Sequence, residues 1–153
     1  MKKQKSTPGA IVKVQFEESC HIYGQLLMKP YVAFYDFKVS DDQSNLREIV
    51  EKPVLFILCV FDHAITKGRW EIIGKVSFEE NNIEIPLQFI QDSYPPYNCF
   101  LIDASGNMRP ASIDQCRGLE RSSVWEPEHV EERLRDFYAS RINRWVESLK
   151  YRE

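Results

Sequence analysis

Hydrophobic and polar residues alternate along the N-terminal part of this chain. Val12, Val14 and Phe16 would lie on one side of an extended backbone, with Lys13 and Gln15 on the other. An alternation with a period of two is typical of a β-strand with one buried face. The pattern recurs after a short polar turn, which predicts an antiparallel hairpin followed by a third strand. The three predicted strands cover residues 10–17, 22–28 and 31–39.

The middle of the chain predicts one short helix and then further strands. Residues 41–50 have apolar positions at helical spacing, with Asp42 as the candidate N-cap and Pro53 as the stop. Residues 54–61 are apolar without a break, which indicates a central strand covered on both faces. Further strands are expected at 70–78, 83–89 and 99–102, with a turn at 104–107 that leads into 108–113. Pro86 places its strand at an edge or a bulge.

The strand that begins near Gly68 has the most distinctive sequence. Trp70 and Ile72 would share one face of it, and Gly68 permits a tight entry. Gly74 is expected at a bulge or at a close approach of the backbone to another group. We therefore predict that Trp70 is a core residue.

One long amphipathic helix is predicted at the C-terminus. Pro127 suits the first helical position, and acidic residues precede basic ones along the segment, as the helix dipole favours. Apolar residues recur at steps of three and four over about six turns, and this stripe is expected to pack against the sheet. It consists of Val130, Leu134, Phe137, Tyr138, Ile142, Trp145 and Leu149.

These elements predict an α+β fold in a single domain. It would contain a mostly antiparallel twisted sheet or a partly closed SH3-like barrel, one short helix, and the long C-terminal helix packed on it. The domain is placed at residues 9–153, after a flexible basic tail at residues 1–8. No apolar run approaches the ~20 residues of a membrane span, and the start of the chain does not resemble a signal peptide. We therefore expect a cytoplasmic protein with no membrane partner.

Residues that could carry catalysis or bind a metal are sparse. The histidines, His21, His63 and His129, lie in no local catalytic motif. His63 follows a buried strand, where Asp62 could orient it, although a loop histidine is the simpler interpretation. The four cysteines form no C-x-x-C pair, and the glycines form no phosphate-binding loop. We therefore predict no catalytic residues, no metal site and no cofactor.

Charge and one loop favour a binding protein. Residues 6–116 carry 9 basic and 15 acidic side chains, a net charge of −6, which disfavours nucleic acid and favours a basic partner. Two tyrosines flank the Pro95-Pro96 step, so the loop offers aromatic area at low entropic cost. Simpler interpretations are a charged surface tuned for solubility and tyrosine rings packed on the domain itself. The candidate partner-binding residues are Glu17, Glu18, Asp41, Asp42, Glu79, Glu80, Tyr94 and Tyr97.

Four short motifs resemble the immunity protein 26 family of bacterial polymorphic toxin systems. They are GAIVKV at 9–14, YGQLL at 23–27, KGRWEIIGK at 67–75 and RGLE at 117–120, and the likeness extends to residues 133–135. The resemblance implies an α+β protein encoded beside a toxin, which protects the producing cell by binding and blocking that toxin. It thus implies a stoichiometric inhibitor and not an enzyme. We further expect the turn at 118–120 to be structural, with Glu120 capping the last helix or pairing with one of its arginines.

Two other functions stay open. SH3-like barrel toxins that cut RNA also begin with a glycine followed by an alternating strand. Such a nuclease would need a basic face for phosphate contacts, which the net acidic body does not offer. Another small cytosolic enzyme, or an orphan regulatory or nucleic-acid-binding module, are the remaining alternatives. The leading expectation is an immunity protein that binds a basic toxin domain, with self-association left open.

Overall fold

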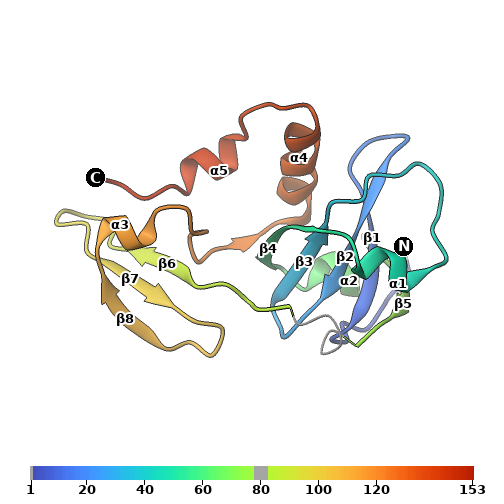
Figure 1. Cartoon of the computed structure of the whole chain (residues 1–153), viewed down its shortest axis with the longest axis horizontal. Coiled ribbons are helices and arrows are strands. Elements are labelled where there is room, and N and C mark those ends of the chain that lie inside the picture. The colour runs from blue at the N-terminus through green and yellow to red at the C-terminus, as the bar shows by residue number, and fades with distance from the viewer. Residues whose placement is uncertain (1, 78–82) are drawn as a thin grey trace.

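The computed structural model describes residues 2–77 and 83–153, and within them it shows nine strands in two sheets and five short helices (Figure 1). The large sheet has the strand order β5-β1-β2-β3-β4-β9, and the small sheet has the order β6-β7-β8. Neighbouring strands are antiparallel except β4 and β9, which are parallel. The predicted α+β class is therefore confirmed. In the described part of the chain neither sheet closes into a barrel.

The elements have the following bounds. The large sheet contains β1 (Ala10–Gln15), β2 (His21–Leu26), β3 (Tyr31–Tyr35), β4 (Val54–Val60), β5 (Glu71–Lys75) and β9 (Val124–Trp125). The small sheet contains β6 (Gln88–Gln91), β7 (Cys99–Ile102) and β8 (Met108–Ala111). The helices are α1 (Leu46–Val50), α2 (His63–Thr66), α3 (Ile113–Cys116), α4 (Pro127–Tyr138) and α5 (Arg144–Ser148).

Both faces of the large sheet are buried. One face packs against α2 and α4, and the other packs against α1 and the segment that precedes β6. The first face contributes Val12, Val14, Leu26, Val32, Phe34 and Leu58, which meet Ala64, Ile65, Val130 and Leu134 from the helices. The second contributes Ile11, Tyr23 and Tyr35, which meet Ile49 of α1, and Ile57 and Cys59, which belong to a cluster with Ile83 and Ile85.

The strands at the centre of the large sheet are β2 and β3, every residue of which is buried. The prediction that residues 54–61 form the central strand is therefore wrong, because β4 lies one strand from the edge, beside the short β9. The sequence does not reveal that β2 is buried on both faces, because one face has polar side chains that form hydrogen bonds inside the fold. The Gln25 amide donates to the Val76 carbonyl at 2.7 Å and accepts from the Tyr35 hydroxyl at 2.7 Å.

The first helix also begins later than expected. Asn45, and not Asp42, is the N-cap of α1, and its Oδ1 accepts a hydrogen bond from the Glu48 N–H at 3.2 Å. The Asp42 carboxylate instead contacts Lys13 Nζ at 2.7 Å. The Asp42 carboxylate is thus bound to a lysine of β1 and does not cap α1.

Two later strands are shorter than predicted. The strand expected at 83–89 is replaced by β6, which begins at Gln88. Pro86 has no backbone N–H to donate to a neighbouring strand, so pairing starts after it. β8 ends at Ala111 because Ser112 starts α3 in a capping box with Gln115. Of the strand expected at 70–78, β5 forms the part from Glu71 to Lys75, and residue 78 lies outside the described residues.

Trp70 is a core residue, as predicted. Its side chain is fully buried and meets the Phe34 ring edge to face, with 5.6 Å between the ring centroids. The indole N–H donates to Glu131 Oε2 at 3.0 Å, and Arg69 donates to both oxygens of the same carboxylate at 2.8 and 2.7 Å. Because Glu131 belongs to α4, these bonds attach the helix to the strand that Trp70 precedes.

The prediction for Gly74 is also confirmed. The register between β1 and β5 shifts by a bulge next to Ile11, which pairs with Gly74. A Cβ atom at this glycine would lie 2.5 Å from Leu46 Cδ1 of α1. The absent side chain therefore leaves room for the Leu46 side chain of α1 against β5.

The long C-terminal helix is not formed, because the chain leaves it after Tyr138. Ser140 adopts a left-handed backbone conformation with φ of 55°. The Arg141 N–H donates to the Asp136 carbonyl at 2.8 Å, and the Ser140 N–H donates to the Phe137 carbonyl at 3.1 Å. This pair of bonds is a Schellman ending, which usually has glycine at the left-handed position. No glycine marks the position here, so the apolar stripe alone predicts a helix that continues.

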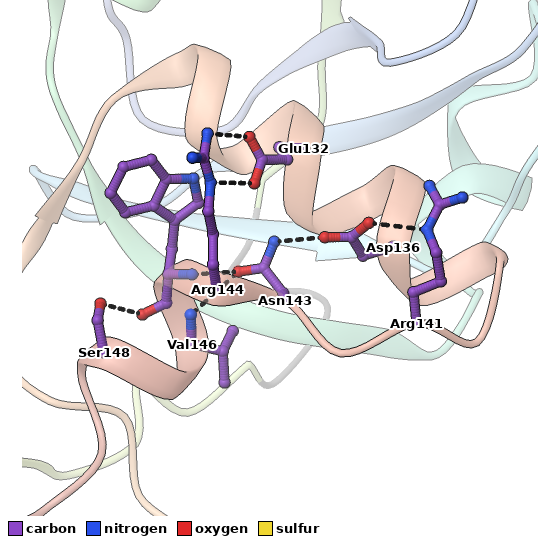
Figure 2. A network of polar contacts seen from close by, with 8 residues as sticks. Glu132, Asp136, Arg141, Asn143, Arg144, Val146 and Ser148 are labelled. Carbon is purple, nitrogen blue, oxygen red and sulfur yellow. Dashed lines mark hydrogen bonds and ion pairs between the residues drawn. The ribbon is translucent and has the colours of Figure 1, made fainter.

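Polar contacts hold the chain in its new direction (Figure 2). Asn143 caps α5, because its Oδ1 accepts the N–H groups of the first turn at 3.1 and 3.0 Å. The Asp136 carboxylate accepts from both Asn143 Nδ2 at 2.9 Å and Arg141 Nε at 3.1 Å. Arg144 forms two further bonds with Glu132 of α4. Ile142 of the predicted stripe is consequently 81% exposed.

The turn at 118–120 has the structural role expected of it. Glu120 accepts two hydrogen bonds from Arg133 of α4, each at 3.0 Å. The flexible tail at residues 1–8 and the single domain at 9–153 remain predictions. In the structure, however, Gln4 donates to the carbonyls of Ile65 and Trp70 and accepts from the Ile72 N–H, so this part of the segment is attached to the large sheet.

The buried position of Trp70 generates a stability prediction. Trp70→Ala should lower the free energy of unfolding by about 3–5 kcal/mol, because it leaves a cavity and removes a donor from a buried carboxylate. Urea unfolding followed by circular dichroism measures this change. Ile142→Ala is the control and should change stability by no more than about 0.5 kcal/mol, since the side chain it truncates is solvent-exposed. A Trp70 variant as stable as the parent would contradict the assignment.

The break after Tyr138 predicts substitutions of opposite sign at adjacent residues. Ser140→Gly should raise the free energy of unfolding by about 0.5–1 kcal/mol, because glycine adopts the left-handed conformation without a steric penalty. Ala139→Gly should lower it by a similar amount, about 0.5–1 kcal/mol, since Ala139 has a negative φ. The same urea experiment distinguishes the two. If the helix ran on through residue 140, both glycines would be destabilising.

Candidate functional site

Four of the candidate acidic residues lie at one end of the large sheet. Gln15 and His21 form the last pair of β1 and β2, and the turn between them contains Glu17 and Glu18. His21 also forms an isolated bridge with Val39, which brings the segment with Asp41 and Asp42 to the same end. Glu18, Asp41 and Asp42 are exposed, and Glu17 is half-buried. Glu79 and Glu80 lie outside the described residues.

Asp42 is the acid of this group that has an internal partner. Lys13 Nζ lies 2.7 Å from Asp42 Oδ1, and this contact lowers the pKa of Asp42 and raises that of Lys13. The charge available to a partner therefore resides mainly on Glu17, Glu18 and Asp41, for which no ion pair is found within the described residues.

The candidate tyrosines lie in the loop that joins β6 to β7. Tyr94 is 81% exposed, and Tyr97 is half-buried. Two hydrogen bonds close the loop below them: the Asp92 N–H donates to the Asn98 carbonyl at 2.9 Å, and the Gln91 side-chain Nε2 donates to the Tyr97 carbonyl at 3.4 Å. The loop thus presents the Tyr94 ring to solvent and does not fold it onto the small sheet.

The structure does not bring the acids and the tyrosines together. The turn between β1 and β2 and the loop between β6 and β7 lie on opposite sides of the molecule along its longest axis (Figure 1). They belong to different sheets, which are joined through the segment before β6 and the elements after β8. A partner that contacts one of these regions does not have to contact the other.

His63 has a carboxylate partner, but it is not Asp62. His63 Nε2 lies 3.1 Å from Glu126 Oε2, and the imidazole stacks on Phe61 with 5.7 Å between ring centroids. The Asp62 carboxylate accepts instead from the Ser6 hydroxyl. In the part of the chain that the structure describes, no serine or cysteine side chain is hydrogen-bonded to a histidine. The arrangement of an activated nucleophile is not assembled there.

Three exposed apolar side chains in the region of β4 and its neighbours were not expected from the sequence. Phe61, Val124 and Met28 are 40%, 46% and 42% exposed. Phe61 and Val124 belong to adjacent segments, since the Phe61 N–H donates to the Trp125 carbonyl, and Met28 belongs to the β2–β3 turn, where the Pro30 carbonyl accepts from the Val60 N–H. An unbroken apolar run such as 54–61 does not reveal which of its residues face solvent.

Two hollows that border the sheets offer little room for a ligand. One of about 80 Å³ lies between Ser6, Leu26 and Asp62, which is small beside the roughly 300–1,000 Å³ of typical ligand pockets. Another of about 290 Å³ lies beside Phe89 and Arg121, but the Arg121 guanidinium is already bonded to the carbonyls of residues 149 and 150. The described residues contain no group of three potential metal ligands and no helix long and apolar enough to cross a membrane.

His21, at the acidic end, has an electrostatic property with a measurable consequence. It is 3% exposed, and its Nε2 lies 2.9 Å from the Tyr23 hydroxyl, which also accepts from the Gln43 N–H. Burial lowers the pKa of His21 below its usual value of 6.5, despite the nearby Asp42. The folded protein therefore takes up this proton less readily than the unfolded chain does.

We therefore predict that stability falls as the pH drops below the ordinary histidine pKa, because the unfolded chain is protonated first. Urea unfolding at about pH 7.5 and about pH 5.5 should show this loss, and His21→Gln should reduce it. His129→Gln provides the control for loss of a histidine ring, since His129 is half-buried on α4 and stacks on Trp145, away from His21. An unchanged pH dependence in the His21 variant would contradict the prediction.

Comparison with known proteins identifies a family. The model of Immunity protein 26 matches residues 7–99, a range that runs from before β1 to the first residue of β7. It contains three of the four motifs that carry the resemblance, whereas the motif at 117–120 and the likeness as far as residue 135 lie beyond it. No curated protein and no solved structure matches the chain. Because the match spans more than half of its residues, the chain belongs to the Immunity protein 26 family.

Proposed function

We propose that this protein binds the toxin domain of its own polymorphic toxin system and blocks it stoichiometrically, in the cytoplasm and without catalysis. The observation that carries the proposal is the family match over residues 7–99. The surface is consistent with it: the described residues offer exposed acids and an exposed aromatic loop, and no assembled nucleophile. Nuclease or other enzymatic activity has no specific observation in its favour.

The two candidate regions would contribute to binding in different ways. The acids around the β1–β2 turn would attract a basic toxin domain over a distance, which mainly raises the association rate. The Tyr94 side chain is a rigid aromatic group in a closed loop, so it would act at short range and lengthen the lifetime of the complex. The two regions lie on opposite sides of the molecule (Figure 1). Because electrostatic attraction acts at a distance, a toxin domain that is held by Tyr94 would not have to contact the acids.

The proposal predicts neutralisation at a one-to-one ratio. The toxin domain encoded beside this gene should lose its activity when an equimolar amount of the protein is added, and the complex should be isolated intact. Tyr94→Ala should speed dissociation about tenfold, which corresponds to about 1.4 kcal/mol. Glu18→Lys combined with Asp41→Lys should slow association and weaken its dependence on salt. Surface plasmon resonance at two salt concentrations measures both rates.

Matched controls separate these effects from general damage. Ile142→Ala removes a side chain as exposed as Tyr94, and Asp114→Lys reverses a carboxylate that is 82% exposed on α3, away from the acidic end. Both should leave the rates unchanged. Inactivation of many toxin molecules by one molecule of this protein would show catalysis and overturn the proposal. An association rate that is indifferent to salt and to the two acids would remove electrostatic steering from it.

A further inference from the structure

One buried side chain lies at the base of the loop that presents Tyr94. This tyrosine loop comprises residues 92–98, between the last residue of β6, Gln91, and the first residue of β7, Cys99, which pair with each other. Gln91 is 6% exposed, whereas residues 92–96 are all exposed. Because packing contributes little to the conformation of an exposed segment, the polar contacts at its base determine how firmly the loop is held.

The Gln91 amide contacts two parts of the chain that are distant in sequence. Its Oε1 accepts from the Arg152 N–H at 2.6 Å, and its Nε2 donates to the Arg152 carbonyl at 2.5 Å. The same nitrogen donates to the Tyr97 carbonyl of the tyrosine loop at 3.4 Å. Figure 1 shows the end of the chain beside this loop. A primary amide has two N–H donors, and here one is directed to each part of the chain.

Residues 149–153, which we call the C-terminal segment, are held by contacts outside the tyrosine loop. The Arg121 guanidinium donates to the first two carbonyls of the segment at 2.8 and 3.0 Å. Tyr151 packs against the core of the small sheet, and Arg117 forms an ion pair with Glu153 at 3.3 Å. The segment is therefore a support that is fixed in its own right, and the loop is connected to it through one amide.

We propose that Gln91 is a positioning residue that transmits the docking of the C-terminal segment to the tyrosine loop. An amide is planar, so the two bonds with Arg152 fix its orientation and direct the other Nε2 hydrogen toward the Tyr97 carbonyl. When the segment is released, the amide rotates freely and the loop loses this contact. A loop that is ordered before binding loses less conformational entropy in a complex. The consequence for toxin binding rests on the proposed function, in which the Tyr94 side chain contacts the toxin domain.

Substitutions at Arg152 and Gln91 test this coupling in the free protein. Arg152→Pro removes the N–H that Gln91 accepts, whereas Arg152→Ala keeps it and removes only an exposed side chain. The readout is the protection of the Asp92 N–H against hydrogen exchange, since its bond to the Asn98 carbonyl closes the loop. Arg152→Pro and Gln91→Leu should each lower this protection about fivefold, and Arg152→Ala should not change it. The double variant of Gln91→Leu with Arg152→Pro should equal Gln91→Leu alone.

Three results of the exchange experiment would overturn the proposal. Unchanged protection in Arg152→Pro would show that the segment does not order the loop. An equal loss in Arg152→Ala would assign the effect to the side chain and not to the backbone bond. A further loss when Arg152→Pro is added to Gln91→Leu would show that the effect does not pass through the amide. Thermal melting of each variant verifies that the small sheet is intact.

The toxin assay separates this proposal from the proposed function. Arg152→Pro should speed dissociation of the toxin domain about fivefold, in the same direction as Tyr94→Ala. If Tyr94→Ala speeds dissociation and Arg152→Pro does not, the loop binds without being positioned, and the proposal is wrong. If Tyr94→Ala itself has no effect, the toxin contact is wrong, and the exchange measurements still decide whether Gln91 positions the loop.

Discussion

The indole of Trp70 and the carboxylate of Glu131 form the contact on which the arrangement of the large sheet and its helices depends. A buried indole N–H requires an acceptor, and a nearly buried carboxylate requires a positive partner. Glu131 accepts the indole N–H at 3.0 Å, and the Arg69 guanidinium donates to the Glu131 carboxylate at 2.7 and 2.8 Å. α4 can satisfy these groups only when it lies against this edge of the sheet. Its apolar residues Val130 and Leu134 then complete the core.

The segment after β8 joins the two sheets. Trp125 of β9 and the first half of α4 belong to the core of the large sheet. The end of the chain is held to the small sheet, since Gln91 bonds to the backbone of residue 152 in both directions and Arg121 bonds to the carbonyls of residues 149 and 150. The family match ends at residue 99 and does not include this connection. The matched part contains β1 to β5 of the large sheet and β6 of the small sheet, and the remainder completes the small sheet and attaches it to the large one.

This architecture separates the surfaces that we associate with function. The acids lie at the far end of the large sheet, and the tyrosine loop lies at the far end of the small sheet (Figure 1). Electrostatic attraction acts over about a Debye length, roughly 8 to 10 Å in physiological salt, whereas apolar contacts act only when surfaces touch. Attraction of a partner and its retention would therefore be controlled by different residues.

The sequence by itself determined the features that depend on neighbouring residues. The alternation around Val12 predicts β1, the setting of Trp70 predicts its burial, and Gly74 predicts the bulge. Each follows from backbone geometry or from the period of a strand, which a short segment encodes.

Only the tertiary structure decided three other features. Gln25 lies at the centre of the large sheet because Val76 and Tyr35, both distant in sequence, satisfy its amide. α4 ends before Ser140, which has a left-handed backbone conformation that the sequence does not predict because no glycine lies there. Hydrogen bonds from Arg141 and Asn143 to Asp136 then fix the direction of the chain that follows. The acids and the tyrosines lie apart because they belong to different sheets, and the order of strands in space depends on long-range pairing that no local pattern specifies.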